Sequence, residues 1–293
     1  MNGVLVIDKS AGMTSHDVVN RVRRIVKERS VGHLGTLDPM ATGVLPLLLG
    51  KMTRLAQFFS DSEKAYEGEI RFGFATDTYD SDGEAAGPPV EVNLTLQQVR
   101  QAACGFQGVI NQVPPPFSAK KVAGVPAYKL ARNKKQVDLK AVQVEIKEFE
   151  ILDLVGDRAR FEARVAAGTY VRSVAHEMGK LLGVGAHLSS LRRTASGEFR
   201  VADAVTLERL ESAMGAGGAE GLMIHPRRVL PALPCVNATE EDVAKIRNGR
   251  AVNLPEMSRA RLVKVFFGQS ELVAVASRVA GTLFQPKVVL GVE

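Results

Sequence analysis

The sequence predicts an α+β protein in which a large domain built on a largely antiparallel mixed sheet precedes a small, β-barrel-like C-terminal domain. Its 293 residues exceed the roughly 100 to 200 residues of a usual single domain. The content of hydrophobic residues, 45%, and of charged residues, 24%, is typical of a globular protein with a sizeable core. Hairpin signals outnumber strand–helix–strand alternation, which favours antiparallel pairing.

The first part of the chain predicts a strand, a helix and a second strand. Residues 3–9, GVLVIDK, are an apolar run typical of a buried strand. Residues 14–29 carry valines at helical spacing, with arginines elsewhere around the axis, which predicts a helix with a core face and a basic face. Residues 66–83 alternate like a half-buried strand and end in Asp/Gly turn residues.

The middle of the chain predicts two helices and a hairpin. Residues 94–106 predict a helix in which Thr95 and Gln98 form a capping box. Residues 142–170 contain two alternating runs joined by VGD, which predicts a hairpin. The stretch YVRSVAHEMGKLLG then predicts a helix that stops near Gly183.

We place the domain boundary near residue 232. The stretches GAGGAEG and HPRRVLPALP, within residues 215–234, interrupt the regular pattern. Residues 239–254 then predict a short capped helix, followed by brief strands with scattered arginines. The expected domains are therefore 1–232 and 233–293.

The net positive charge of the chain is concentrated in one segment. Residues 112–140 contain seven Lys/Arg and one Asp, a surplus of six that equals the formal net charge of +6 for the whole chain. Phe117 and Tyr128 are interleaved with the lysines, a composition suited to binding RNA phosphates and stacking on bases. A basic surface loop with no ligand is the alternative, and the residues alone leave both interpretations open.

Several classes of protein and site are excluded. The two cysteines, Cys104 and Cys235, are too few for a disulfide framework or a thiolate zinc site, and the five histidines lack ligand spacing, so we expect no metal. The N-terminus lacks a basic signal-peptide region, and no apolar run approaches the roughly 18 residues of a membrane span. We therefore expect a cytoplasmic protein that does not enter membranes.

A lone carboxylate stands out in residues 31–50, VGHLGTLDPMATGVLPLLLG. Asp38 lies between a glycine-rich turn and an apolar run, without a counter-ion nearby in sequence. An isolated aspartate in a loop is more often a turn former or helix cap than a functional group.

The chain resembles the TruB family of bacterial tRNA pseudouridine synthases. The resemblance runs through seven ordered blocks: GVLVIDKSAGMTSHDVVNRVRRI, VGHLGTLDPMATGVLPLLLG, KAYEG, TDTYDSDG, QVPPPFSAKKVAGVPAYKLAR, GTYVRSVAHEMG and LRRTASG. It implies a pseudouridine synthase fold and isomerisation of the tRNA T-loop uridine conventionally numbered 55. It also implies a monomer that needs no cofactor, guide RNA or protein partner. Residues 233–293 resemble, more diffusely, the RNA-binding PUA domain.

The resemblance assigns the chemistry to Asp38. Pseudouridine formation needs one nucleophile or base, and the carboxylate could add to base C6, add to ribose C1′, or remove a sugar proton. The sequence leaves these three routes open. By the same resemblance, Arg172 would hold the Asp38 carboxylate ionised and oriented in a dry pocket.

The resemblance also implies five further site residues. His33 would occupy the gap that the flipped uridine leaves in the RNA stack. Tyr66 would stack on the target uracil, Tyr170 and Leu191 would line the base pocket, and Lys9 would support the loop around it.

Three alternatives to a stand-alone tRNA enzyme would require other features of the sequence. A guide-RNA-dependent relative would not need residues 112–140 as a basic clamp on tRNA. A catalytically idle RNA-binding protein would not need Asp38, Tyr66 and Arg172 intact. A retaining glycosidase would need a second carboxylate about 5 Å from the first, and no such motif is seen.

Overall fold

The computed structural model describes residues 1–118, 120–122, 125–126 and 139–290. Its largest sheet contains β1 (Gly3–Lys9), β2 (Val31–His33), β3 (Thr42–Leu49), β4 (Lys64–Phe72), β5 (Gly108–Gln112), β8 (Val142–Val155), β9 (Arg158–Val165), β10 (Ala186–Ser196) and β11 (Phe199–Arg200). A second sheet contains β12 (Cys235–Asn237), β13 (Val252–Asn253), β14 (Leu262–Phe267), β15 (Glu271–Ala280) and β16 (Leu283–Val289). A short third sheet consists of β6 (Lys121–Val122) and β7 (Val125–Pro126).

Helices pack around the sheets. The α-helices are α1 (Ser15–Val26), α2 (Leu96–Cys104), α4 (Val171–Leu181), α5 (Leu207–Gly215) and α6 (Glu240–Arg247). The 3-10 helices are η1 (Gly50–Phe58), η2 (Val201–Asp203), η3 (Glu220–Leu222) and η4 (Pro226–Arg228). Within the described ranges, no helix is both long enough and apolar enough to cross a membrane.

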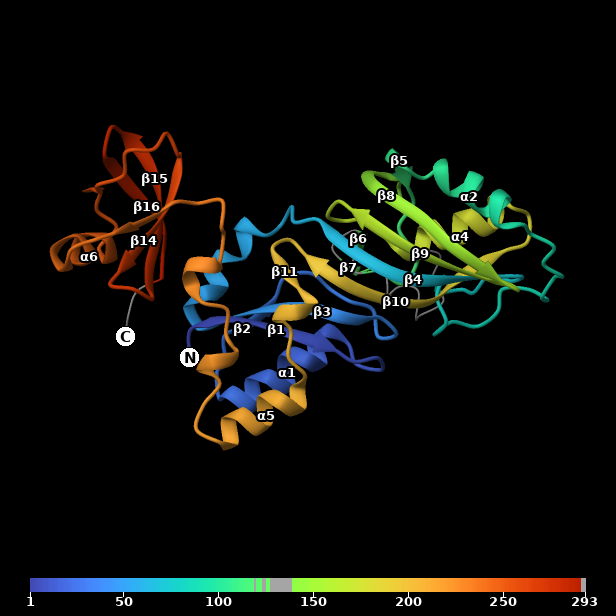
Figure 1. Ribbon diagram of the computed structural model, residues 1–293, viewed down its shortest axis with the longest axis horizontal. Helices are drawn as coiled ribbons and strands as arrows, with labels where there is room; N and C mark the ends of the chain where they lie inside the picture. Colours follow the sequence, from blue (N-terminus) through green and yellow to red (C-terminus); the bar gives the residue numbers. More distant parts are fainter. Residues whose placement is uncertain (119, 123–124, 127–138, 291–293) are drawn as a thin grey trace.

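The large sheet is mixed and mostly antiparallel, as the sequence predicts. Its strand order is β1-β3-β10-β4-β9-β8-β5, with β2 beside β3 and β11 beside β10. Strands β3 and β10 pair in parallel through Thr42 and Gly43, whereas the other pairs of this sheet in the described chain are antiparallel. The α+β class with a largely antiparallel sheet is therefore confirmed. The C-terminal sheet lies at one end of an elongated molecule, and the large sheet extends from beside it to the other end (Figure 1).

Local signals fix several boundaries as expected. The capping box of Thr95 and Gln98 starts α2, and a second box, of Thr14 and Asp17, starts α1. The predicted hairpin is β8–β9, which turns at Gly156 with φ +60°. Helix α4 ends just before Gly183, whose φ of +74° stops further helical growth.

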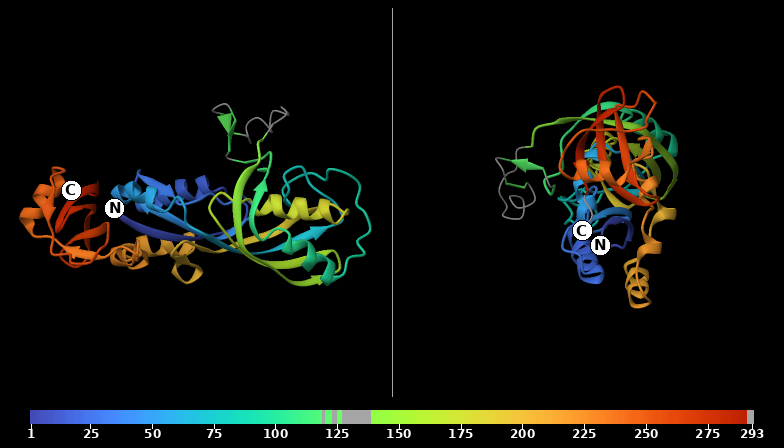
Figure 2. Two further views of the ribbon diagram at one scale, coloured as in Figure 1. Left: turned by 90° about the horizontal axis from the view of Figure 1, so that it is seen from above. Right: turned by 90° about the vertical axis from the view of Figure 1, so that its left-hand side faces the viewer.

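The side chains on the two faces of β1 pack in different hydrophobic clusters. Leu5 and Ile7 pack in the cluster that α1, α2, α4 and α5 cover, whereas Val4 and Val6 point to the opposite side. This alternation places a helix layer on one face of the sheet, with α1 and α5 near β1 and with α2 and α4 at the far end (Figures 1 and 2).

The C-terminal sheet shares a hydrophobic cluster with the large sheet. Val4, Val6 and Leu48 of the large sheet belong to the same buried cluster as Phe266 and Val275 of the C-terminal sheet. Across the same junction, the guanidinium of Arg54 donates a 2.8 Å hydrogen bond to the Val289 carbonyl, and the Lys287 ammonium lies 5.6 Å from the centre of the Phe58 ring. The second sheet therefore covers an apolar face of the first.

Candidate active site

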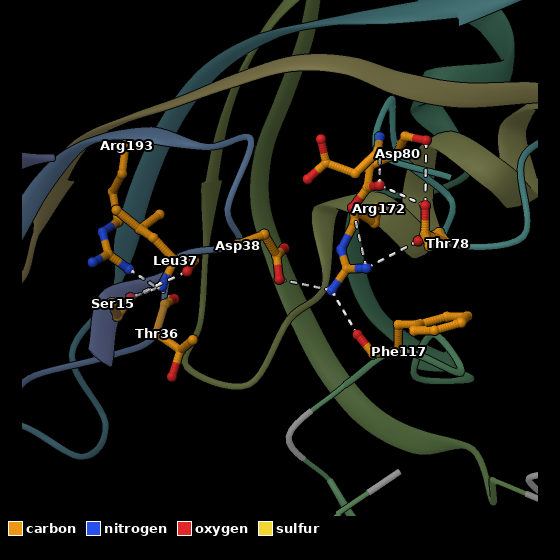
Figure 3. Close-up of polar contacts among 10 residues, drawn as sticks. Ser15, Thr36, Leu37, Asp38, Thr78, Asp80, Phe117, Arg172 and Arg193 are labelled. Carbon is orange, nitrogen blue, oxygen red and sulfur yellow. Dashed lines mark hydrogen bonds and ion pairs between the residues drawn. The ribbon is translucent and has the colours of Figure 1, made fainter. Parts of the chain in front are cut away.

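The loop that carries Asp38 connects β2 to β3 and is held on its N-terminal side by two buried polar residues. Ser15, at the start of α1, accepts a 2.8 Å hydrogen bond from the Leu37 amide and donates one of 3.1 Å to the Leu37 carbonyl. Arg193 of β10 reaches the carbonyls of Gly35, at 3.1 Å, and Val44, at 2.7 Å. Figure 3 shows Ser15 and Arg193 on one side of Asp38.

The C-terminal side of the loop is held by Lys9, the last residue of β1. Its buried ammonium donates to the carbonyls of Pro39 at 3.1 Å and Ala41 at 2.6 Å, and to the carbonyl of Ser10 at 2.9 Å. Burial, joined by the charge of nearby Arg193, lowers the pKa of Lys9 to about 8, although Asp38 opposes the shift. Lys9 thus supports the loop through its backbone.

Asp38 pairs with the arginine that the resemblance places beside it. Nη2 of Arg172 donates a 2.8 Å hydrogen bond to Oδ1 of Asp38 (Figure 3). The Arg172 side chain is only 5% exposed, whereas that of Asp38 is 33% exposed, so the carboxylate faces outward from a buried support. Nη1 and Nη2 of Arg172 also donate to the carbonyls of Thr78, at 2.9 Å, and Phe117, at 3.0 Å.

A second carboxylate, which the sequence did not predict, completes this arrangement. Oδ2 of Asp80 lies 3.2 Å from Nη1 of Arg172, and Asp80 is buried. Its Oδ1 accepts hydrogen bonds from the Thr78 hydroxyl at 2.5 Å and from the Asp82 amide at 3.1 Å. Asp80 was visible only as one aspartate in TDTYDSDG, where turn formation is the ordinary role, and its partner lies 92 positions further along the chain.

The electrostatic balance at Asp38 is set by burial and by two neighbouring charges of opposite sign. Loss of water contact raises the pKa of Asp38, Arg172 counteracts that rise, and the carboxylate of Asp80 adds to it. Arg172 also occupies the first turn of α4, where the helix dipole disfavours a cation. The two carboxylates therefore stabilise a guanidinium that its position in the helix does not.

Tyr170 directly precedes α4, and its backbone is held by the side chain of Gln112, the first residue of the basic segment 112–140. Gln112 accepts a 2.8 Å hydrogen bond from the Tyr170 amide and donates one of 3.0 Å to the Tyr170 carbonyl. Ser173 likewise donates to the Val113 carbonyl at 2.8 Å. Burial raises the pKa of the Tyr170 phenol, while the charge of Arg172 lowers it and that of Asp38 raises it.

The three remaining predicted residues lie on strands of the large sheet. Leu191 is buried on β10, and Tyr66 lies on β4 directly opposite Arg193. His33, on β2, is half-buried, and burial together with Arg193 lowers its pKa, which favours the neutral imidazole. Among the described contacts, neither Tyr66 nor His33 has a direct polar bond to Asp38.

The structure describes only the ends of the basic segment and two short strands within it. Of the residues named for it, Phe117 lies beside Arg172, and Lys120 is exposed. Tyr128 and the range 127–138, which holds several of the lysines, lie outside the described residues.

Two family models match the chain. The N-terminal domain of the TruB family of pseudouridylate synthases matches residues 23–171, and the C-terminal domain of tRNA pseudouridylate synthase B matches residues 172–230.

Curated relatives match over nearly the whole chain. A tRNA pseudouridine synthase B from Solibacter usitatus is 48% identical over 99% of this chain and 100% of its own length. A protein of the same name from Geobacter sulfurreducens is 38% identical over 96% and 95% of the two chains. The structure of a Cbf5-Nop10-Gar1 complex contains a chain that is 27% identical, with a TM-score of 0.72 over 99% of this chain and 85% of that one. The present chain therefore belongs to the TruB family of pseudouridylate synthases.

Proposed function

We propose that this enzyme converts uridine to pseudouridine in the T-loop of tRNA, at the position conventionally numbered 55, and that Asp38 carries the chemistry. The observation that carries this proposal is a partly exposed carboxylate held by a buried guanidinium, which a second, buried carboxylate holds in turn. The names of the relatives, tRNA pseudouridine synthase B, support tRNA as the substrate. The cytoplasm is the expected place of action.

The reaction balances without a redox partner. The bond from ribose C1′ to uracil N1 breaks, the base turns, and C5 forms the new bond to C1′. C5 then loses its proton, and N1 gains one, so product and substrate have the same mass. Asp38 acts as the nucleophile or base that divides this rearrangement into easier steps. Arg172 keeps that carboxylate ionised against the effect of burial.

The other site residues serve access and recognition in this proposal. A uridine in a folded loop must leave the stack before Asp38 can reach it, and the neutral ring of His33 is suited to fill the gap. Tyr66 stacks on the extruded uracil, and Tyr170 and Leu191 line its pocket. Lys9 keeps the loop in place through three carbonyls.

RNA binding is assigned to two regions. The surplus of six positive charges supports residues 112–140 as a clamp on the phosphate backbone. Residues 233–293 are proposed as a PUA-like RNA-binding domain, with 1–232 as the catalytic domain. We propose a monomer that needs neither guide RNA nor protein partner, whereas structural neighbours come from a Cbf5-Nop10-Gar1 complex and an H/ACA RNP bound to a substrate RNA.

The test is incubation of the purified protein with an isolated T-arm stem-loop, followed by pseudouridine mapping. Product at the T-loop uridine in the absence of guide RNA is expected. Asp38→Asn should bind the RNA within a few-fold of the parent, because no phosphate contact is lost, and form no detectable product. Asp61→Asn, at an exposed turn, is the matched control and should turn over normally. Substantial product from folded Asp38→Asn protein would overturn the assignment.

The clamp is tested separately by salt dependence. Neutralising Lys120, Lys121, Lys134 and Lys135 should weaken tRNA binding and flatten the dependence of log affinity on log salt, by roughly one unit of slope or less per lost phosphate contact. An unchanged slope would remove residues 112–140 from the RNA interface.

A further inference from the structure

Tyr79 has a backbone conformation that an aromatic residue rarely adopts. Its φ is +67°, in the left-handed region, whereas most positive values in this chain belong to glycines. A bulky side chain is strained there, and such strain persists only where surrounding contacts hold it. The residue lies between Thr78 and Asp80, the two residues that bind Nη1 of Arg172.

A ring stack holds Tyr79 in place. Its ring lies on that of His176 with centroids 3.6 Å apart and planes inclined by 10°. His176 is buried on α4, four residues after Arg172 and therefore on the same side of the helix. The loop and the helix are thus joined by the contacts of Arg172 with Thr78 and Asp80 and by the stack.

Backbone hydrogen bonds fix the other side of the turn. The Leu188 amide of β10 donates to the Tyr79 carbonyl at 3.0 Å, and the Ser81 amide donates to the Leu188 carbonyl at 3.0 Å. The Thr76 hydroxyl donates to the Asp80 carbonyl at 2.7 Å. The turn is therefore held between β10 and α4, and the stack is its ring contact with the helix, beside the contacts of Arg172.

We propose that Tyr79 and His176 are positioning residues for catalysis. The stack keeps the left-handed turn against α4, and the turn presents the Thr78 carbonyl and the Asp80 carboxylate to Arg172, which orients Asp38. This inference rests on the proposed function, because it assigns the stack a role in that reaction. Neither ring contacts the reacting atoms.

The variants separate the contact between the two rings from the polar groups that the rings carry. Tyr79→Phe and His176→Phe keep two flat rings and should retain the rate of the parent. Tyr79→Ala and His176→Ala lose the stack, and we expect the single-turnover rate to fall roughly tenfold with RNA affinity unchanged, because small displacements of a catalytic group are costly. In an Asp80→Asn background, where the link to Arg172 is already weakened, Tyr79→Ala should cost little more.

A second measurement needs no substrate. Backbone amides of residues 77–82 should exchange hydrogen faster in Tyr79→Ala than in the parent or in Tyr79→Phe. If exchange is unchanged, the stack does not hold the turn and the inference fails. A parent that forms no pseudouridine overturns the proposed function, whereas an active parent with unaffected alanine variants overturns the positioning role alone. An equal tenfold loss in the Asp80→Asn background would also overturn it.

Discussion

Replacing Arg172 with lysine should slow turnover while leaving RNA affinity nearly unchanged. The guanidinium makes four polar contacts through two nitrogens, to two carboxylates and two carbonyls, at 2.8 to 3.2 Å. An ammonium on a shorter side chain has three donors and no planar fork, so it cannot satisfy both Asp38 and Asp80 together with both carbonyls.

The size of the effect follows from the lost contacts. We expect lysine to lose two charge-assisted hydrogen bonds, each worth about 1.5 to 3 kcal/mol, so that about 3 to 6 kcal/mol of interaction around the ion pair disappears. If the lower figure is needed in full at the transition state, the rate falls roughly a hundredfold.

The assay is single-turnover pseudouridine formation with enzyme in excess over a T-arm stem-loop, run beside filter binding. Arg192→Lys is the matched control, because Arg192 is adjacent to the site residues of β10 and holds Asp8 with two hydrogen bonds of 2.8 and 2.9 Å. The control should stay within a few-fold of the parent. Equal rates for Arg172→Lys and Arg192→Lys would refute the reasoning.

The pH dependence of an Arg172→Met variant tests the role of Arg172 independently, through the direction in which activity and stability shift with pH. Arg172 lowers the pKa of Asp38, so its removal leaves burial and the carboxylate of Asp80 to raise that pKa further. The acid limb of residual activity should therefore move to higher pH. A folded-state pKa raised above the unfolded value also means that stability is lost as pH rises through it. The free energy of unfolding of Arg172→Met should fall furthest below that of the parent near neutral pH, and the difference should shrink on acidification. Urea titrations of both proteins at several pH values would measure it.

Three further perturbations test the surrounding structure. Gly43→Ala should lower the free energy of unfolding by about 2 kcal/mol or more, as measured by urea denaturation, because the φ of Gly43 is +98° and a Cβ would lie 2.2 Å from the Arg193 carbonyl oxygen. Gly32→Ala is the control, because a Cβ at that position meets open space. Gln112→Glu should destabilise the protein by about 1 to 3 kcal/mol in the same assay, because its buried side chain loses the donor to the Tyr170 carbonyl. Deleting residues 233–293 should weaken tRNA binding in filter assays and leave measurable turnover. The deletion should also lower the melting temperature, because it uncovers the apolar face that the C-terminal sheet covers. An unchanged melting temperature would contradict the shared cluster.

Elements encoded by neighbouring residues were predictable from sequence. The box of Thr95 and Gln98 and the hairpin turn at Gly156 depend on contacts within a few positions, and the structure contains both. The parallel pairing of Thr42 with Arg192 joins residues 150 positions apart, and no local pattern encodes it. The shared core of the two sheets is missed for the same reason, because the strand β1 reads as buried without indicating what buries its second face.

The site divides in the same way. Asp38 and Arg172 could be named only through the resemblance, and the ion pair between them is present. The sequence does not single out Asp80, because turn formation already explains an aspartate at that position. The sequence pattern does indicate a role for Arg193. It lies on the same inward face of β10 as Leu191, two residues earlier, and a charged side chain on a buried face needs polar partners. Its partners are carbonyls, which carry no sequence signal.

Those carbonyl partners determine the charge balance under Asp38. Within the described structure, the side chains of Lys9 and Arg193 donate their hydrogen bonds to backbone carbonyls, so their charges are not cancelled by a carboxylate. Burial lowers the pKa of Lys9, the repulsion from Arg193 lowers it further, and the attraction to Asp38 opposes the shift. The loop is thus backed by positive charge that favours the ionised form of Asp38. Under the proposed function, we expect the same charge to attract an RNA backbone toward the partly exposed carboxylate.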